Sequence, residues 1–482
     1  MPETAATLTS PQYIADNGGP SALDLRGRCL HFVGIGGCGM SGLAHLARNA
    51  GAKCTGSDHA ASEVTESLVR DGFGVATEQS ADTLPEHCDL LIISAAIKPD
   101  HPEVAEARRR GVQVVKYAQL LGQMMIGKTG VAVAGTHGKS TATSLLGHVL
   151  IQAGLDPSVI VGATCAQIGG GARCGASDLL VAEACEFDRS FHHFYPTHAL
   201  ILNVEEDHLD MYDSIDDIVE AFAVFARKTP GDGTLLINHE MPHRLAVTAD
   251  LTCQVETIGF APQADWRVEA ACGLASTVTL RRNNNIVAQW SAPLPGEHMA
   301  YNAAAAAVTA HRLGADWRDI EQAIAGFRGL DRRMQLLGKC PVNGGTATIV
   351  DDYGHHPTEI DTTLRALRRH YQPRRLICVF QPHQHSRTRF LLDQFAASFV
   401  EADIIVVPHI YFVRDSEKER HAVRAGDLVD KVRHRGGRAM HLYPFDAIVE
   451  QLELMLQPDD LVVTMGAGDV WRVARALMPG SA

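Results

Sequence analysis

Residues 135–141 combine the amino-acid types that bind a nucleotide phosphate. An apolar run at 131–134 leads into Gly-Thr-His-Gly-Lys-Ser-Thr, and helix-compatible residues follow. The two glycines let backbone N–H groups face an anion, and the helix adds its positive N-terminal end. Lys139 can reach terminal phosphate oxygens, and the Ser140 hydroxyl can bind Mg²⁺. The strand, turn and helix order predicts a phosphate loop, although Val133 stands where the full pattern has glycine.

Acidic residues and a histidine follow two predicted strands beyond this loop. The strand 179–182 leads to Glu183, and the strand 199–204 leads to Glu-Glu-Asp-His-Leu-Asp at 205–210. Because parallel strands end at one edge of a sheet, Glu183 and His208 are candidate ligands for a divalent metal beside the phosphates. The alternative for His208 is an ordinary surface histidine.

A second glycine-rich turn lies near the N-terminus. A strand at 29–33 leads into Gly-Ile-Gly-Gly-Cys-Gly at 34–39, a helix is expected to about Asn49, and Asp58 follows a second strand. This spacing is the dinucleotide-binding fingerprint, which alone would suggest a nicotinamide-dependent oxidoreductase. Such a turn also binds any other diphosphate at its helix N-terminus, so a nucleotide-sugar fits as well. A turn without a ligand is the third reading.

Further strands are expected to deliver polar or small residues to sheet edges. A buried strand at 90–97 ends in small residues. In the C-terminal third, strands at 347–350, 376–380, 404–407 and 461–464 each precede such a segment, and Pro357 can begin a helix. The cations and imidazoles of these segments suit carboxylates and phosphates, so we expect a second ligand-carrying α/β sheet.

Composition indicates an ordinary globular protein. At roughly 150 residues per domain, 482 residues suggest three domains. A net charge of −13 argues against nonspecific nucleic-acid binding. The eleven cysteines include no C-x-x-C pair, so we expect neither a zinc site nor disulfides, but reduced thiols in the cytoplasm. No leader or membrane-spanning stretch is seen, and residues 1–25 read as a loose arm.

Taken in order, these motifs resemble the Mur ligase family over almost the whole chain. The resemblance implies an α/β fold of three domains: a Rossmann-like UDP-sugar-binding domain at 1–127, a central P-loop-type ATPase domain at 128–336, and a Rossmann-like C-terminal domain at 337–482 that closes over ATP and brings the amino acid. The motifs that carry it are His-Phe-Val-Gly-Ile-Gly-Gly-Cys-Gly-Met-Ser at 31–41, Gly-Thr-His-Gly-Lys at 135–139, Asp-Asp-Tyr-Gly-His-His-Pro at 351–357, Phe-Gln-Pro-His at 380–383 and Met-Gly-Ala-Gly-Asp at 465–469.

The resemblance also implies roles for individual residues. Catalysis would depend on Lys139, Glu183, His208, His355 and Arg387. One Mg²⁺ would bind Ser140 and Glu183, and a second would lie at His208. The expected ATP-binding residues are Gly135, Thr136, His137, Gly138, Lys139, Ser140, Thr141, His298, Asn302, Arg332 and Asp351. The expected residues for the UDP-sugar and the amino acid are Gly36, Gly37, Gly39, Met40, Ser41, Asp58, Ser94, Ala95, Tyr353 and His383.

The implied reaction joins L-alanine to the lactoyl carboxylate of UDP-N-acetylmuramate, with ATP consumed through an acyl phosphate, in peptidoglycan precursor synthesis. A monomer or homodimer without nucleic-acid or membrane partners is expected. A relative that adds another amino acid or a peptide is the nearest alternative, and Tyr353-Gly354 favours a single amino acid. An oxidoreductase would leave the Lys139 loop unexplained. An inactive UDP-sugar sensor is supported only by the positions at which the chain departs from the family pattern.

Four positions depart from the family pattern. Ser140 replaces a usual threonine, Cys185 an aspartate, Met299 an asparagine and Gln384 an arginine. Loss of a cation at 384 would weaken amino-acid binding by about 1–3 kcal/mol or change the acceptor.

Overall fold

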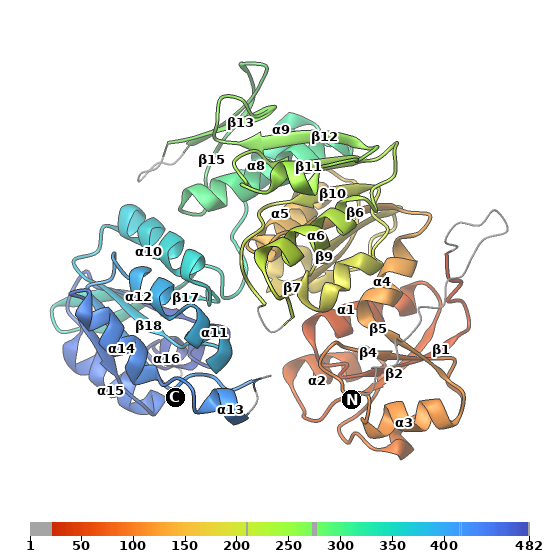
Figure 1. The fold of residues 1–482 in the computed structure, drawn as a ribbon, viewed down its shortest axis with the longest axis horizontal. Helices are drawn as coiled ribbons and strands as arrows, with labels where there is room; N and C mark the ends of the chain where they lie inside the picture. The colour runs from red at the N-terminus through yellow and green to blue at the C-terminus, as the bar shows by residue number, and fades with distance from the viewer. Residues whose placement is uncertain (1–21, 209–210, 272–276, 414, 416, 481–482) are drawn as a thin grey trace. The chain divides into compact units, whose positions relative to one another are not determined.

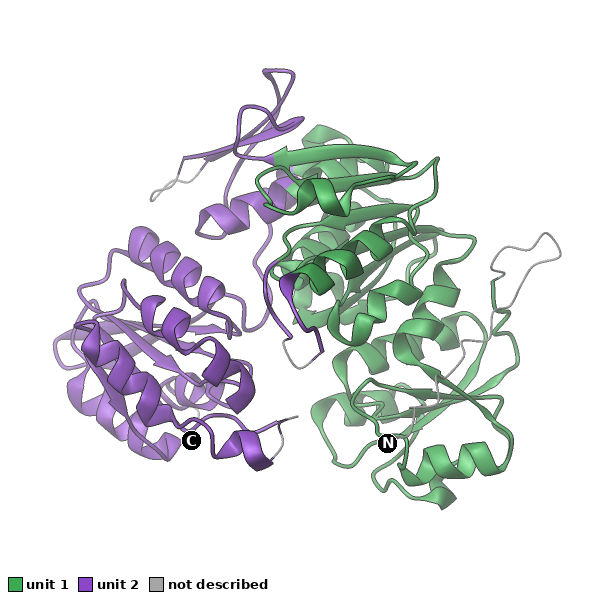
Figure 2. Ribbon diagram, viewed as in Figure 1, with its two compact units in different colours: residues 1–204, 216–258, 305–320 green, residues 205–215, 259–304, 321–482 purple. Residues whose placement is uncertain are grey.

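The computed structural model describes residues 22–208, 211–271, 277–413, 415 and 417–480. Strands and helices alternate, and the strands form three sheets (Figure 1), which confirms the expected α/β class. The chain divides into two compact units (Figure 2). Unit 1 contains residues 1–204, 216–258 and 305–320, and unit 2 contains residues 205–215, 259–304 and 321–482. Most of the expected N-terminal arm, and the last two residues of the 205–210 motif, lie outside the described residues.

The first sheet is wholly parallel and has the order β3-β2-β1-β4-β5. The chain adds strands to one side of β1 and then returns to its other side, so the order reverses between β1 and β4. Ligands of open α/β sheets bind outside the strand ends at such a point. The elements are β1 Cys29–Val33, α1 Cys38–Asn49, β2 Lys53–Ser57, α2 Glu63–Arg70, β3 Gly74–Ala76, η1 Ala81–Thr83, β4 Leu90–Ile93, α3 Pro102–Arg109, β5 Gln113–Lys116 and α4 Tyr117–Met125.

Seven consecutive strands of the central sheet have the order β12-β11-β10-β6-β9-β7-β8. Among them, only β8 is antiparallel to its neighbour. Helix α5 is buried on all sides from residue 140 to residue 150, which matches its lack of a polar face. The elements are β6 Thr129–Ala134, α5 Lys139–Gln152, β7 Ser158–Cys165, η2 Ala166–Ile168, β8 Gly170–Arg173, β9 Leu179–Ala184, η3 Phe187–His193, β10 His198–Ile201, α6 Ile215–Ala226, β11 Thr234–Asn238, α7 Arg244–Val247 and β12 Gln254–Gly259.

The segment that follows is an antiparallel meander. Strands β13 Trp266–Ala271, β14 Thr277–Arg282 and β15 Asn285–Ser291 pair in order. The turn between the last two has positive φ at Asn283 and Asn284, 50° and 64°, as a tight hairpin requires and as the sequence predicts. Helices α8 Glu297–Arg312 and α9 Trp317–Ala325 follow.

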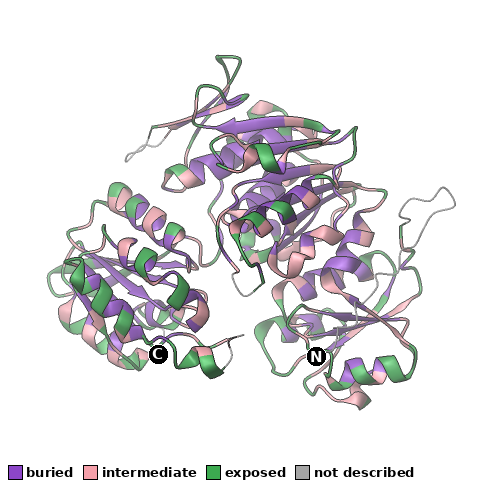
Figure 3. Ribbon diagram, in the orientation of Figure 1, coloured by how far each residue is buried: buried purple, intermediate pink, exposed green. Residues whose placement is uncertain are grey.

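The third sheet has the order β16-β17-β21-β18-β19-β20, and only β16 is antiparallel. Alternate residues of β18 enter two different apolar cores, Leu376, Cys378 and Phe380 on one side and Ile377 and Val379 on the other. Both faces of the sheet are therefore covered (Figure 3). The elements are β16 Gln335–Val342, β17 Gly345–Asp352, α10 Pro357–Tyr371, β18 Leu376–Phe380, α11 His385–Phe390, α12 Leu392–Ala397, β19 Ile404–Val407, α13 Glu417–Arg420, α14 Ala425–His434, β20 Ala439–His441, α15 Phe445–Met455, β21 Leu461–Met465 and α16 Trp471–Ala476.

Several strand ends differ from the sequence-based expectation. The strand expected at 90–97 ends at Ile93, because a turn closed by the N–H of Ile97 and the carbonyl of Ser94 follows it. The strand expected at 199–204 ends at Ile201. Strand β17 is longer than expected and includes Asp351 and Asp352. Within the described ranges, no helix has both the length and the apolarity to cross a bilayer.

Candidate active site

The phosphate loop joins strand β6 to helix α5 in unit 1. Gly135 has a φ of 146°, and Gly138, which caps α5, has a φ of 82°. A Cβ at 135 would lie 3.0 Å from the Cβ of Leu202 and 3.2 Å from the backbone nitrogen of Asn203. Glycine is therefore required at both positions, for backbone conformation and, at 135, also for space. This is the conformation that the residue types predict.

Lys139 is held inside the loop that it follows. Its ammonium donates to the carbonyl oxygens of Gly135 and Thr136 and to both carboxylate oxygens of Glu186, at 2.8 and 3.0 Å. Burial lowers the pKa of this ammonium, but Glu186 and the nearby Cys185 and Glu183 together outweigh burial and raise the pKa above its usual range. Lys139 is consequently a fixed positive charge. Glu186 lies two residues beyond the end of β9 and is not among the site residues that the sequence predicts.

Asn203 fixes the middle of the loop and was also missed. Its side-chain oxygen accepts from the backbone N–H of His137 at 2.7 Å, and its amide donates to the carbonyl of the same residue at 3.0 Å. A single amide side chain thus satisfies both backbone polar groups of one loop residue. An asparagine two residues beyond the end of a buried strand, opposite a glycine-rich turn, is the signal that could have identified it.

Ser140 and Glu183 offer oxygen atoms that suit Mg²⁺. Ser140 is buried in the first turn of α5. Glu183 lies near the end of β9, paired with Val133 of β6, and its carboxylate accepts from the N–H of Gly162 at 2.8 Å. A hydroxyl and a carboxylate are the hard ligands that this ion prefers.

Cys185, which stands where the family pattern has aspartate, is a neutral thiol. Its pKa is raised to about 12, by burial first and by the charge of Glu186 second.

The N-terminal turn is held by the acidic residue that the fingerprint assigns to a ligand. The Asp58 carboxylate accepts from the backbone N–H of Gly36 at 2.9 Å, and a Cβ at Gly36 would lie 2.9 Å from that oxygen. Below the turn, Ser57 donates to the buried carboxylate of Glu103 at 2.6 Å, and His31 contacts the same carboxylate at 2.8 Å. The end of β2 is therefore fixed by a buried polar network, which sequence spacing did not reveal.

The other expected substrate residues of this domain differ in exposure. Gly37 caps α1, and Gly39 packs against the ring of Tyr117, whose nearest atoms would lie 3.2 Å from an added Cβ. Met40 is buried in the core, and the Ser41 hydroxyl donates to the carbonyl of Cys38. After β4, Ser94 is half-buried and Ala95 is exposed.

Helix α1 packs directly on the central sheet within unit 1. A Cβ at Gly42 would lie 2.6 Å from the Cβ of Ala172 in β8, and the thiol of Cys38 donates to the carbonyl of Val161 in β7. The pKa of Tyr117 is raised, by burial first and by the charge of Glu183 second. The glycine-rich turn and the candidate metal ligand Glu183 are therefore close enough to interact.

Unit 2 brings Arg332 and Asp351 together at the edge of the third sheet. The guanidinium lies 3.3 Å from the carboxylate and also donates to the carbonyls of Gly466 and Gly468, while Thr464 donates to Asp351 at 2.6 Å. Burial raises the pKa of Asp351 despite these partners. These two expected nucleotide contacts therefore form one structural group.

Asp207 and Arg387 form a buried ion pair in unit 2. The guanidinium donates to one carboxylate oxygen at 2.7 and 3.1 Å, and both side chains are at least nine-tenths buried. Arg387 also donates to His383 at 3.3 Å. Burial raises the pKa of Asp207, but Arg387, together with the neighbouring histidines, outweighs burial and holds the pKa well below the usual range. Next to this pair, His208 has a φ of 54°, and its ring nitrogen lies 3.8 Å from the carboxylate.

Two other expected site histidines of unit 2, His355 and His298, have lowered pKa values. Burial lowers the pKa of His355 to about 4, and its ring donates to the carbonyl of Tyr353. His355 is therefore a weak base. Burial likewise lowers the pKa of His298 in α8 to about 4, and its Nδ1 has no hydrogen-bond partner among the described residues. Asn302, one turn further along α8, is buried.

The expected site residues thus fall into two groups. Unit 1 holds the phosphate loop, Glu183 and the N-terminal turn, whereas unit 2 holds His208, His298, Asn302, Arg332, Asp351, Tyr353, His355, His383 and Arg387.

Family profiles match three consecutive stretches of the chain. The description "Mur ligase family, catalytic domain" matches residues 30–129, "Mur ligase middle domain" matches residues 133–310, and "Mur ligase, glutamate ligase domain" matches residues 332–468.

Similar proteins match the chain along nearly its full length. UDP-N-acetylmuramate–L-alanine ligases of Lachnospira eligens and Caldanaerobacter subterraneus are 38% and 39% identical to it, and each alignment covers 93% of this chain and 97% of the relative. The crystal structure of UDP-N-acetylmuramate-alanine ligase from Thermotoga maritima is similar with a TM-score of 0.77 at 25% identity, over 93% of this chain and 97% of that one. A murein peptide ligase from Psychrobacter arcticus has a TM-score of 0.69 at 25% identity, over 94% and 99%.

Proposed function

This chain belongs to the Mur ligase family, and we propose that it joins L-alanine to the carboxylate of UDP-N-acetylmuramate while converting ATP to ADP and phosphate. The observation that carries the proposal is a correctly formed phosphate loop in a chain that matches L-alanine-adding relatives over 93% of its length. The product would be a peptidoglycan precursor. The free state of every cysteine in the described residues agrees with a reducing cytoplasm.

The chemistry follows from the poor reactivity of a carboxylate. Its oxygen attacks the γ-phosphate of ATP, so a P–O bond forms, ADP leaves, and the carboxylate becomes an acyl phosphate. The amine of L-alanine then attacks the acyl carbon through a tetrahedral intermediate, phosphate leaves, and the amine loses its proton. Lys139 supplies fixed positive charge where the phosphoryl group is transferred, and the backbone N–H groups at 135–138 add to it.

We assign one Mg²⁺ to Ser140 and Glu183, whose oxygen atoms fit this ion, and a second metal ion to His208. When bound, these ions would neutralise phosphate charge. Imidazole nitrogen is a less usual ligand for Mg²⁺ than oxygen, so Mn²⁺ is the better match for His208.

In unit 2, we assign Arg332 and Asp351 to the nucleotide, and His383 and Arg387 to the amino acid and the reacting carboxylate. The buried guanidinium of Arg387 supports the second assignment because it presents cationic N–H groups beside an imidazole. His355 contributes a neutral ring rather than a strong base.

Phosphate release from ATP tests the function directly. The assay contains Mg²⁺ and UDP-N-acetylmuramate, and compares L-alanine, glycine, L-serine and an L-alanyl peptide as acceptors. Release that requires both the sugar and L-alanine is the expected result. Faster phosphate release with the L-alanyl peptide than with L-alanine would instead indicate a peptide ligase. Binding of the sugar without phosphate release in the presence of any acceptor would indicate a sensor.

A further inference from the structure

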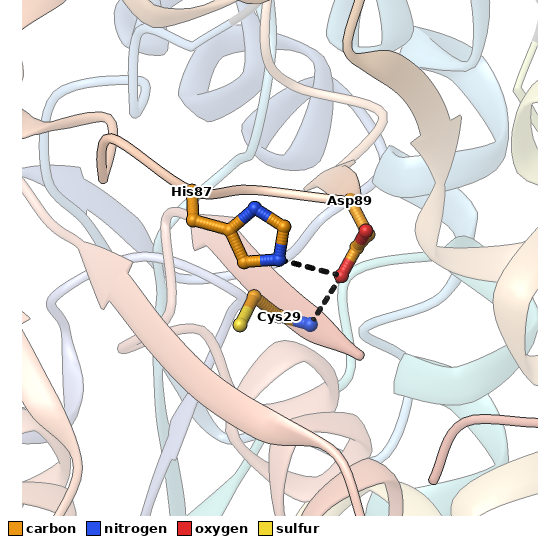
Figure 4. Close-up of side chains that lie close together, drawn as sticks. All are labelled: Cys29, His87 and Asp89. Atoms are coloured by element: carbon orange, nitrogen blue, oxygen red, sulfur yellow. Dashed lines mark hydrogen bonds and ion pairs between the residues drawn. The ribbon is translucent and has the colours of Figure 1, made fainter. Parts of the chain in front are cut away.

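Three potential metal ligands of different chemical types gather in the first domain, outside the site described above. The Sγ of Cys29, a ring nitrogen of His87 and a carboxylate oxygen of Asp89 all lie within 4.8 Å of one another (Figure 4). Thiolate, imidazole and carboxylate are the three ligand types that Zn²⁺ uses in proteins. From this juxtaposition we propose that Cys29, His87 and Asp89 form a binding site for a thiophilic divalent cation, with Zn²⁺ as the best-fitting ion.

The backbone fixes two of the ligands relative to each other. Cys29 begins β1 and Asp89 directly precedes β4, and these strands are parallel neighbours. The N–H of Asp89 donates to the carbonyl of Cys29 at 2.8 Å, and the N–H of Cys29 donates to the Asp89 carboxylate at 2.7 Å. The second bond orients the carboxylate, as an outer partner of a ligand does in metal sites.

His87 completes the set with little rearrangement. Its Nε2 lies 3.7 Å from the Asp89 oxygen, and its side chain is 77% exposed and therefore free to rotate. Zinc–ligand bonds of about 2.0–2.3 Å place the ligands of one ion within roughly 4 Å of each other. The His87–Asp89 separation is already within that value, and the upper limit of 4.8 Å for the three ligand atoms is short enough for one side-chain rotation to close. Exposure on the His87 side leaves room for a water molecule as the fourth ligand.

The cluster lies away from the ligand edge of its sheet. Cys29 is at the first residue of β1, whereas the glycine-rich turn follows the last, about 16 Å away at the usual rise per strand residue. Metal binding would tie the start of β1 to the segment before β4. We therefore expect it to raise the unfolding temperature and to leave the ligase reaction unchanged.

Titration of the full-length, chelator-treated protein with Co²⁺ tests the site, because a thiolate bound to Co²⁺ gives a charge-transfer absorption band that histidine and carboxylate ligands do not. We expect the band in the wild type and its displacement by one equivalent of Zn²⁺. Cys29→Ser should abolish the band, and His87→Gln should weaken Zn²⁺ binding at least tenfold. Cys174→Ser, which removes another half-buried free thiol, should titrate like the wild type.

His87 is exposed, so its replacement leaves the fold intact and keeps the test valid even if Cys29→Ser is unstable. The proposal is overturned if the wild type gives no thiolate band, or if the band persists unchanged in Cys29→Ser. An unchanged Zn²⁺ affinity in His87→Gln would equally refute the assignment.

Discussion

The ammonium of Lys139 lies 2.8 and 3.0 Å from the two carboxylate oxygens of Glu186, and both side chains are almost fully buried. The same ammonium also donates to two carbonyls of the phosphate loop. The charge that we assign to phosphoryl transfer therefore already has partners in the protein. A bound phosphate would compete with them for the lysine, so Lys139 has both a structural and a proposed catalytic role.

Replacing Lys139 by alanine should nearly abolish turnover. Loss of a preorganised cation at the transferring group typically reduces kcat by about 10²–10³-fold or more. We expect ADP formation to fall by at least this factor, while binding of UDP-N-acetylmuramate, measured by calorimetry, stays intact because its predicted turn is Gly34–Gly39. Turnover close to the wild-type rate would contradict the phosphate role.

A double substitution separates the two roles of this lysine. Lys139→Met alone leaves a buried Glu186 carboxylate without its cation, which destabilises proteins by about 3–5 kcal/mol. Adding Glu186→Gln removes that charge, so the free energy of unfolding should recover largely in the double variant while activity stays lost. Urea unfolding measures the first quantity and ADP release the second. If stability does not recover, the ion pair is not the reason for the loss.

The sequence was sufficient for the elements that regular patterns specify. Strands β1, β18 and β19 have the predicted bounds, because apolar runs between turn residues define them. Glycine spacing likewise predicted the conformation of the phosphate loop. Asn203 follows another strand, and only its place opposite the glycine-rich turn indicates its role. Glu186 also follows another strand and could not be predicted, since it acts through a side-chain hydrogen bond that no local pattern encodes. The same holds for Cys29 and Asp89, whose spacing of 60 residues matches no zinc motif.

The hydrogen bond from Gly36 to Asp58 should control binding of the UDP-sugar. Asp58→Ala removes the acceptor that holds the Gly36 peptide, and hydrogen bonds to charged groups contribute about 1.5–3 kcal/mol. We expect the KM for UDP-N-acetylmuramate to rise by about tenfold or more, with the KM for ATP unchanged. Asp58→Asn keeps an acceptor oxygen and should have a smaller effect. Equal effects of the two substitutions would instead favour a role for the charge itself.

Gly296 provides the space for the His298 ring. Its φ is 105°, and an added Cβ would lie 2.6 Å from the Cε1 of His298 and 2.9 Å from the Cβ of Ala366. Gly296→Ala should therefore displace the imidazole and raise the KM for ATP severalfold if His298 contacts the nucleotide as we expect. Gly314→Ala is the matched control, since Gly314 has a φ of 103° with nothing near its added Cβ. An unchanged KM in the first variant would remove His298 from the nucleotide site.

The Asp207–Arg387 pair predicts a specific dependence of stability on pH. Because Arg387 holds the folded-state pKa of Asp207 below its unfolded value of about 3.9, the carboxylate stabilises the fold at every pH above about 4. This contribution is lost as the pH falls below that value toward the folded-state pKa. Asp207→Asn leaves Arg387 buried without a countercharge and should lower the free energy of unfolding by about 3–5 kcal/mol near neutrality.

Unfolding by urea at a series of pH values measures this effect. The stability curves of the wild type and Asp207→Asn should lie apart near neutral pH and approach each other as the pH falls below about 4, because protonated aspartic acid no longer balances the guanidinium either. Asp393→Asn removes an exposed partner of Lys431 and should follow the wild type closely. Curves that stay a constant distance apart at all pH values would show that the charge of Asp207 is not what stabilises the pair.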